Sequence, residues 1–236
     1  MSNYAMGLQP RCYALVPAAG VGSRSGADGP KQYVQLAGRP MMAHTLEALG
    51  RVPDLAATLV VLSPGDESFE QLLPEFGGER AWVARCGGAS RAETVANGLQ
   101  ELLARGAQPH DWVLVHDAAR CLIRPEWVER LIAACQDDEV GGLLAQPLAD
   151  TLKQSSHGRV MATVDRRSKW AAQTPQMFRL GLLAPALRQA GEAVTDEASA
   201  VEALGHQPLL VEGALENFKL TWPADFALAE RLLGSR

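Results

Sequence analysis

The chain of 236 residues is long enough for one large α/β domain with a sizeable hydrophobic core. Its formal net charge of -5 argues against a general nucleic-acid-binding protein, because such proteins usually carry a basic excess. No apolar run approaches the roughly 18 residues of a membrane span, and the N-terminal residues lack the apolar segment of a signal peptide. The four cysteines include no C-x-x-C pair, so we expect reduced, mostly buried thiols in a cytoplasmic protein.

Short apolar runs alternate with amphipathic stretches along the whole chain. The predicted strands span residues 13–16, 58–62, 82–85, 113–116 and 142–145. Helices are expected to begin near Met41, Glu67, Ser90, Pro125, Leu180, Thr195 and Pro223. Strands separated by helices indicate βαβ units, so we expect a single Rossmann-like α/β domain over residues 1–236, with a mostly parallel twisted sheet and helices on both faces.

Two of the helix starts carry specific signals. Ser90 and Glu93 have the spacing of a capping box, in which each side chain binds a backbone N–H at the start of the helix. Thr195 is predicted to cap a helix whose first turn contains Asp196 and Glu197, where negative charge is favourable. We interpret these two carboxylates as features of a helix start rather than as catalytic groups.

The stretch from about 147 to 169 interrupts the alternation of strands and helices. Residues 148–153 and 160–164 have strand-like composition, and the Ser-Ser-His-Gly sequence at 155–158 between them is typical of a turn. We interpret the stretch as a β-hairpin arm that projects from the domain, and a solvated loop is the alternative.

A glycine-rich loop with two cations follows the first predicted strand. The loop contains Gly20 and Gly22, and the cations are Arg24 and Lys31. Glycines after a strand allow backbone N–H groups to approach a phosphate closely. The loop matches neither the dinucleotide fingerprint, which needs a third glycine, nor a Walker A loop, which needs Gly-Lys-Ser/Thr.

This arrangement suits nucleotidyl transfer. In that reaction an oxygen nucleophile attacks the α-phosphorus of a nucleoside triphosphate, and negative charge builds on the phosphate oxygens and the departing pyrophosphate. Catalysis then depends on positioning and on electrostatic stabilisation, which Arg24 and Lys31 would supply. Mg²⁺ is the expected cofactor, because it binds through few carboxylates together with substrate phosphates. A solvated surface loop is the alternative interpretation.

The sequence PAAGVGSRSGADGPKQY at 17–33 resembles the signature of sugar-phosphate and polyol-phosphate nucleotidyltransferases. Within that superfamily the chain is similar to the 2-C-methyl-D-erythritol 4-phosphate cytidylyltransferases of the non-mevalonate isoprenoid pathway. Further blocks agree in order at residues 87–91, 116–120, 163–166, 174–176, 195–199 and 217–219, so the resemblance covers nearly the whole chain. It implies transfer of CMP from CTP to the polyol phosphate, with release of pyrophosphate.

The resemblance also implies roles for individual residues. Arg24 and Lys31 would be catalytic, and Asp117 would contact the metal or the acceptor hydroxyls. Arg166 and Lys219 would hold the acceptor phosphate, and Thr151 would reach the acceptor pocket from the arm of a partner subunit, which makes the protein a homodimer with exchanged arms. The other expected substrate-binding residues are Ala18, Ala19, Gly20, Gly22, Gly87, Gly88, Thr94, Ala118 and Thr174.

Three other functions remain as alternatives. The same chemistry could act on another polyol phosphate such as ribitol 5-phosphate, since few residues set the acceptor pocket. A CTP-binding module without turnover would not need to keep cations for a transition state. A nicotinamide oxidoreductase is disfavoured by the missing third glycine. His116 is expected to end a buried strand and to orient the following loop rather than to act as a base, because the attacking phosphate oxygen is already ionised near neutral pH.

Overall fold

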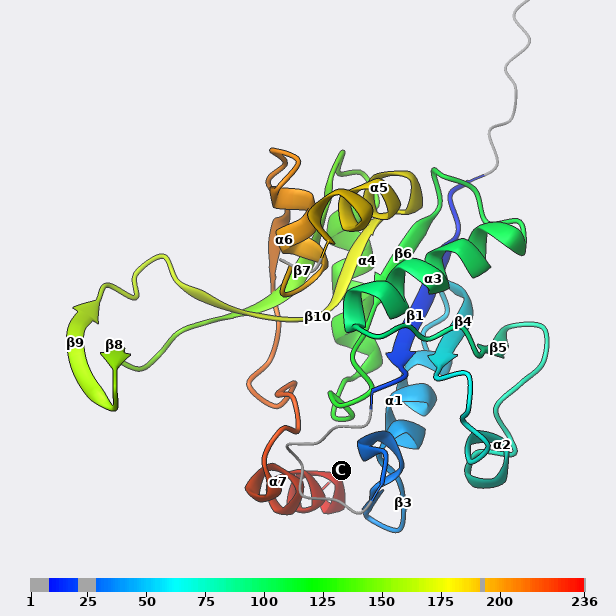
Figure 1. Cartoon of the computed structure of the whole chain (residues 1–236), viewed down its shortest axis with the longest axis horizontal. Coiled ribbons are helices and arrows are strands. Elements are labelled where there is room, and N and C mark those ends of the chain that lie inside the picture. Colours follow the sequence, from blue (N-terminus) through cyan, green and yellow to red (C-terminus); the bar gives the residue numbers. More distant parts are fainter. Residues whose placement is uncertain (1–8, 21–28, 192–193, 236) are drawn as a thin grey trace, which may run out of the picture.

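The computed structural model describes residues 9–20, 29–191 and 194–235. A seven-stranded sheet forms the centre of the molecule (Figure 1), and its spatial order is β11-β7-β10-β6-β1-β4-β5. Its strands are β1 (Cys12–Ala18), β4 (Leu55–Leu62), β5 (Ala81–Ala84), β6 (Trp112–Val115), β7 (Gly141–Pro147), β10 (Trp170–Arg179) and β11 (Leu209–Glu212). The five strands expected from the sequence are all present.

The sheet is mostly parallel, as predicted, with one exception. The β1–β4, β1–β6, β4–β5 and β11–β7 pairs are parallel, whereas β10 runs antiparallel to both of its neighbours, β6 and β7. Neither β10 nor the edge strand β11 was expected from the sequence. In β10 the proline at 175 obscured the strand pattern, and the structure accommodates it with a register shift between Ala172 and Gln176.

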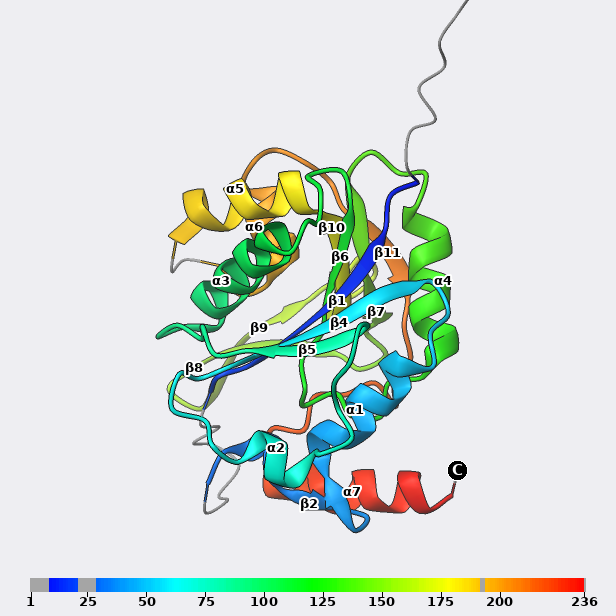
Figure 2. The same ribbon diagram turned by 90° about the vertical axis from the view of Figure 1, so that its right-hand side faces the viewer.

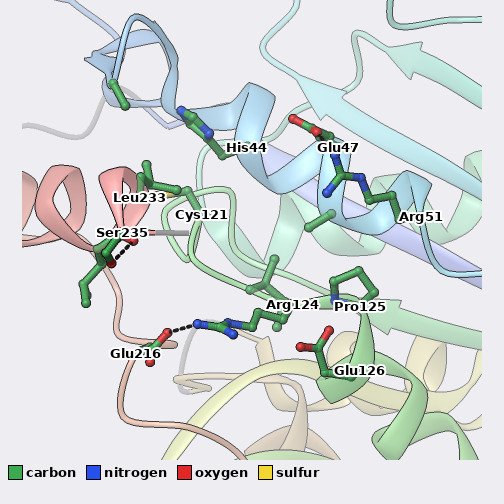
Figure 3. Close-up of a pocket in the computed structure, with 14 residues that line it drawn as sticks. His44, Glu47, Arg51, Cys121, Arg124, Pro125, Glu126, Glu216, Leu233 and Ser235 are labelled. Atoms are coloured by element: carbon green, nitrogen blue, oxygen red, sulfur yellow. Dashed lines mark hydrogen bonds and ion pairs between the residues drawn. The ribbon is translucent and has the colours of Figure 1, made fainter.

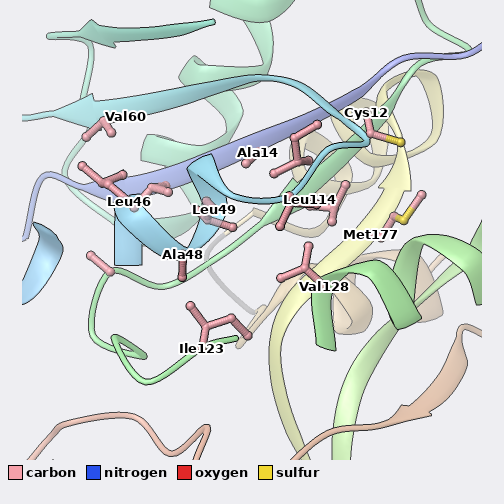
Figure 4. Packing of buried hydrophobic residues seen from close by; sticks show 14 of the residues in the cluster. Cys12, Ala14, Leu46, Ala48, Leu49, Val60, Leu114, Ile123, Val128 and Met177 are labelled. Carbon is pink, nitrogen blue, oxygen red and sulfur yellow. The ribbon is translucent and has the colours of Figure 1, made fainter. Parts of the chain in front are cut away.

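Helices cover both faces of the sheet, which confirms the predicted fold class (Figure 2). One hydrophobic cluster packs α1 (Met41–Gly50) and α4 (Pro125–Cys135) against the sheet, and Figure 4 shows part of this cluster around Ala14 and Leu114. The other face carries α3 (Arg91–Ala104), α5 (Leu180–Ala190) and α6 (Glu197–Glu202). The buried strand residues are therefore apolar on both sides, as a sheet covered on two faces requires.

Smaller elements complete the fold. They are a 3-10 turn at Lys31–Tyr33, β2 (Gln35–Leu36), β3 (Arg39–Pro40), α2 (Phe69–Leu72) and α7 (Pro223–Gly234). A third cluster, which includes Leu36, Leu122 and Leu220, packs α7 beside the β2–β3 pair. No helix in the described ranges is long and apolar enough to cross a membrane. All four cysteines are free thiols, and three of them are buried, as expected.

The helix starts agree with the sequence except in detail. The Ser90 side chain accepts a hydrogen bond from the Glu93 N–H, but the Glu93 carboxylate returns to the N–H of Ala89 rather than to that of Ser90. Helix α2 begins two residues after Glu67. The expectation that Thr195 caps α6 was wrong: Asp196 is the cap and accepts from the Ser199 N–H. A carboxylate is a better acceptor than a hydroxyl at this position, and the Thr195 N–H instead donates to the Ser199 hydroxyl.

The predicted hairpin arm is present and extends away from the sheet (Figure 1). It consists of β8 (Leu152–Ser156) and β9 (Arg159–Val164), so the first strand begins four residues later than residue 148. His157 and Gly158 join the strands, and both have positive φ angles, which matches the two-residue hairpin turns that follow the twist of the strands. The arm leaves the sheet between β7 and β10, which pair with each other.

Candidate active site

A cavity of about 480 Å³ lies where several parallel strands of the sheet end. Ala18 ends β1, Gly88 follows β5, and Asp117 comes two residues after β6. Ligands of open α/β sheets bind at this carboxyl edge. Of the residues predicted to bind substrate, the cavity is lined by Ala18, Ala19, Gly20, Lys31, Gly88, Thr94, Asp117, Ala118 and Lys219.

The cavity carries a positive excess. Among the described residues that line it, the cations are Lys31, Arg91 and Lys219, and the one carboxylate is Asp117. The Lys31 ammonium donates a hydrogen bond to the backbone carbonyl of Leu220, which fixes its stem against the segment that carries Lys219. A volume of this size suits a small-molecule ligand, and the charge favours a phosphate-bearing one.

The two glycines after β5 are required by close packing. A Cβ atom at Gly87 would lie 2.2 Å from the Ala19 Cβ and 2.7 Å from the Leu62 carbonyl oxygen. The Gly87 N–H donates to that same carbonyl, so the turn is held against the end of β4. The next turn residue, Gly88, donates its N–H to the hydroxyl of Thr94 at 3.1 Å, and the hydroxyl in turn donates to the Ser90 carbonyl. Thr94 therefore shapes the glycine turn as well as lining the cavity.

Asp117 sits at the centre of a charged network. Its Oδ1 accepts from Arg91 Nε at 2.8 Å, and its Oδ2 lies 2.8 Å from the Lys219 ammonium. Its backbone N–H donates to the hydroxyl of Thr174, which is how β10 takes part in the site. Burial alone would raise the pKa of the Asp117 carboxyl, but Arg91 and Lys219 outweigh that effect and hold the pKa well below its usual range. The carboxylate is therefore ionised at neutral pH.

Arg91 and Glu197 belong to this network, although the sequence did not point to their pairing. Arg91 Nη1 and Nη2 donate to Glu197 Oε1 and Oε2 at 2.7 and 3.1 Å. Glu197 is fully buried in the first turn of α6. The two residues are 106 positions apart, and no local pattern signals an ion pair at such separation.

Lys219 is positioned by the segment that precedes α7. Asn217 is fully buried, and its side-chain amide donates to the carbonyl of Thr174. The Asn217 carbonyl accepts from Arg120 Nη1 at 2.6 Å. These bonds tie the Lys219 segment to both β10 and the loop after β6, so the lysine and Asp117 are brought together by buried contacts rather than by chance surface proximity.

His116 fills the role expected of it. It follows β6 and is fully buried, with its Nδ1 beside the Thr174 hydroxyl at 3.1 Å and its Nε2 beside the Arg120 carbonyl at 3.3 Å. Burial lowers its pKa to about 4. The imidazole is therefore neutral at pH 7 and orients the loop that carries Asp117.

Several predicted site residues are not among those that line the cavity. Thr151 and Arg166 are exposed on the arm and do not line the cavity of their own chain. Gly22 and Arg24 lie outside the described residues. Thr174 and Gly87 do not line the cavity either, but their hydrogen bonds to Asp117 and Leu62 hold two of its walls.

A second, larger cavity of about 650 Å³ lies beside α1 and the start of α4 (Figure 3). Its charged lining is mixed, with Glu47, Glu126 and Glu216 against Arg51 and Arg124. It lacks a glycine loop and an excess of cations, and none of its residues was predicted to be functional. We therefore place the chemistry in the smaller cavity, on charge and backbone geometry rather than on size.

No group of three or more His, Cys, Asp or Glu residues in the described ranges is arranged to hold a metal ion. A cage made only of protein ligands is thus absent from that part of the chain. The lining carboxylate of Asp117 fits a different mode, in which Mg²⁺ takes most of its ligands from substrate phosphates and water.

The whole described architecture is that of one enzyme family. Residues 12–235 match the family model of 2-C-methyl-D-erythritol 4-phosphate cytidylyltransferase. The cytidylyltransferase of that name from Laribacter hongkongensis is 57% identical over 227 residues, which is 95% of this chain and 96% of the relative. A bifunctional enzyme of Albidiferax ferrireducens is 60% identical over 96% of this chain, and the chain spans 54% of that longer relative.

Solved structures agree with the sequence matches. A 4-diphosphocytidyl-2C-methyl-D-erythritol synthase superimposes with a TM-score of 0.85 at 44% identity, covering 96% of this chain and 99% of the other. The Francisella tularensis 2-C-methyl-D-erythritol 4-phosphate cytidylyltransferase gives a TM-score of 0.79 at 31% identity, covering 94% and 99%. Together with the cavity at the carboxyl edge of the sheet, these matches show that the chain belongs to the 2-C-methyl-D-erythritol 4-phosphate cytidylyltransferase family of nucleotidyltransferases.

Proposed function

We propose that the protein carries out the reaction of its family, the transfer of CMP from CTP to 2-C-methyl-D-erythritol 4-phosphate. The products are 4-diphosphocytidyl-2-C-methyl-D-erythritol and pyrophosphate, which places the enzyme in the non-mevalonate route to isoprenoid precursors. The observation that carries the proposal is the net-positive cavity between the β1 and β5 turns, where Lys31, Asp117 and Lys219 converge in a chain of this family.

The cavity divides into two parts by chemistry. The β1 turn (Ala18, Ala19, Gly20) and Gly88 line the cavity with small or absent side chains, so CTP can approach their backbone closely. Lys31 stabilises the charge that develops on the α-phosphate and on the departing pyrophosphate, and Arg24 is proposed to do the same. Asp117 would help to hold Mg²⁺, which would neutralise part of the charge of the triphosphate.

The acceptor enters from the Lys219 side. Its phosphate oxygen attacks the α-phosphorus, the new P–O bond forms, and the bond to pyrophosphate breaks. That oxygen is already ionised near neutral pH, so no general base is needed. Asp117, held ionised mainly by Arg91 and Lys219, accepts hydrogen bonds from the acceptor hydroxyls, while Lys219 contacts the acceptor phosphate.

We propose further that the acceptor pocket is completed by a partner subunit. Thr151 and Arg166 are exposed on the arm and lie apart from the cavity of their own chain. Val160 and Met161, also on the arm, leave 64% and 66% of their surface exposed, which is unusual for apolar residues on a strand. A homodimer in which each arm lies over the other subunit would bury these side chains and deliver Arg166 to the acceptor.

Pyrophosphate release tests the reaction. Purified protein is mixed with CTP, Mg²⁺ and 2-C-methyl-D-erythritol 4-phosphate, beside ribitol 5-phosphate and a blank without acceptor. Release with the methylerythritol phosphate alone is expected. Release with ribitol phosphate alone would keep the mechanism but change the acceptor. If the protein binds CTP but releases no pyrophosphate with either acceptor, it is a CTP-binding module without turnover.

Mixed dimers test the exchanged arms. The variants Lys219→Ala and Arg166→Ala are each expected to be weakly active alone. If Arg166 acts across the dimer, a mixed dimer has one intact site, so a refolded equal mixture should recover about a quarter of wild-type activity. No recovery, with mixed dimers shown by mass spectrometry, would place Arg166 in its own chain's site.

A further inference from the structure

We propose that Arg91 and Glu197 are positioning residues for the transfer, with Glu197 holding the guanidinium of Arg91 and Arg91 holding the carboxylate of Asp117. This inference rests on the proposed function, because it assigns the pair to the acceptor side of the same reaction. The hydrogen bonds of Arg91 link Glu197 on α6 to Asp117 in the loop after β6, with Arg91 itself at the start of α3.

The geometry leaves Arg91 little freedom. Its planar guanidinium uses Nη1 and Nη2 on the two oxygens of Glu197, and its Nε on Asp117 Oδ1 at 2.8 Å. A fork of this kind fixes both the direction and the rotation of the group. Glu197 is fully buried, and the Asp117 side chain is only 10% exposed, so solvent cannot readily replace these partners.

Arg91 and Lys219, the two cations closest to Asp117, differ in how firmly they are held. The Lys219 side chain is 40% exposed and ends in a flexible ammonium, and its recorded ion pair is with Asp117. An acceptor phosphate that arrives in the cavity will draw Lys219 toward itself. Asp117 Oδ2 would then keep only the more distant Arg120 Nε, at 4.0 Å, and a buried carboxylate that loses a close partner is destabilised. Arg91 remains on Oδ1 and keeps the carboxylate in place for the acceptor hydroxyls.

Glu197 has a second consequence for Arg91. Arg91 lines the cavity and could itself bind an incoming phosphate, because a free guanidinium fork matches phosphate oxygens well. Glu197 occupies both terminal nitrogens and so keeps the fork turned away from the substrate. Replacing Glu197 would release the fork, and both the position of Asp117 and the binding mode of the acceptor would change.

A double-mutant cycle tests the inference. The variants are Glu197→Gln, Asp117→Asn and the two combined, and kcat and both KM values are measured for each. Glu197→Gln should lower kcat/KM for the acceptor by about 10- to 100-fold, as expected for a small displacement of a reacting partner, with the CTP KM nearly unchanged. In the Asp117→Asn background the same change should have less than about a threefold effect, because its route to the substrate is already removed.

A structural role would give different results. If Glu197→Gln lowers activity by the same factor with and without Asp117, or raises both KM values equally, the inference is overturned. Arg91→Lys provides a second variant, which keeps the charge but loses the fork, and the same non-additivity is expected. Glu70→Gln is the matched control, because it breaks the surface pair with Arg85 (2.6 Å) away from the cavity, and it should leave all constants unchanged.

Binding measurements separate this inference from the proposed reaction. If the wild-type protein does not turn over 2-C-methyl-D-erythritol 4-phosphate, the proposed function fails, and the cycle is then run on calorimetric Kd values for that phosphate and for ribitol 5-phosphate. Non-additive Kd changes for either would still support the coupling through Asp117. Additive changes, or no measurable binding of either compound by a folded protein, would overturn it.

Discussion

The cavity and the arm differ in how many contacts with the rest of the chain hold them in place. Around the cavity, Asp117 is held by Arg91, by Lys219 and by a backbone bond to Thr174, and Glu197 behind Arg91 is fully buried. On the arm, β8 and β9 pair with each other and with no other described strand, and most of their residues are exposed. An isolated two-stranded hairpin is marginally stable in water. The carboxylate of Asp117 is therefore positioned by side chains from several parts of the chain, whereas little of the described chain covers the arm.

The largest expected effect is on kcat, and it should differ between a lysine of the cavity and a lysine of the arm. Lys31→Ala should lower kcat by about 10²- to 10³-fold, because it removes a cation from the developing charge on the phosphates. The KM for CTP should change little. The same substitution on the arm, Lys153→Ala, removes only a hydrogen bond to the Thr163 hydroxyl and should leave kcat unchanged. Steady-state pyrophosphate release measures both, and a near-normal kcat for Lys31→Ala would contradict the assignment.

A second test asks whether the arm contributes to chemistry at all. Arg166→Ala should raise the acceptor KM by about 10- to 100-fold, as expected for the loss of a charged contact to a phosphate, with the KM for CTP nearly unchanged. The neighbouring Arg167 pairs with Asp165 at 2.7 Å on the exposed surface, so Arg167→Ala is the matched control. Equal changes in both KM values for Arg166→Ala would remove Arg166 from the acceptor site.

The buried histidine next to Asp117, His116, should make stability depend on pH. The pKa of His116 is lowered from 6.5 to about 4 by burial, so the unfolded chain takes up a proton before the folded chain does. The stabilising effect of the neutral ring is complete above pH 6.5 and decreases as the pH falls toward 4. Between pH 7 and pH 4.5 the free energy of unfolding should fall by about 2–3 kcal/mol from this group.

Urea unfolding at the two pH values measures this effect. His116→Gln removes the titrating ring, so the difference between pH 7 and pH 4.5 should shrink by that amount, whatever the variant's absolute stability. His157 lies in the exposed turn of the arm, and His157→Gln should leave the wild-type difference intact. An unchanged difference for His116→Gln would show that other groups cause the pH dependence.

The smallest expected effects are on stability, and they come from a glycine beside the cavity and a glycine in the arm turn. Gly87→Ala places a methyl group against Ala19 and the backbone of Leu62, which should destabilise the protein by about 1–3 kcal/mol through overpacking. Gly158 has no neighbour within 4 Å at its Cβ position, but its φ of +74° disfavours alanine. Gly158→Ala should therefore loosen the arm turn without changing the thermal midpoint of the sheet. Equal shifts in Tm would show that the arm and the sheet unfold together.

Much of the fold could be predicted from local patterns, because apolar runs and cap residues signal strands and helix starts within a few positions. The missed strands show the limit: in β10, Pro175 concealed a strand whose register shift depends on its neighbours, and β11 has only four residues. The cavity residues next to strand ends were identified by motif. The pairing of Arg91 with Glu197 could not be predicted from the sequence, because it depends on how α3 and α6 pack.

The junction of the arm with the sheet affects how the arm can change in evolution. Pro147 and Trp170 are paired neighbours on β7 and β10, and the Leu148 N–H donates to the Lys169 carbonyl just beyond them. The ends of the arm are thus already adjacent, and a direct link between them would close with little loss of chain entropy. The length and sequence of the arm can therefore change without altering the strand registers of the sheet that positions the cavity.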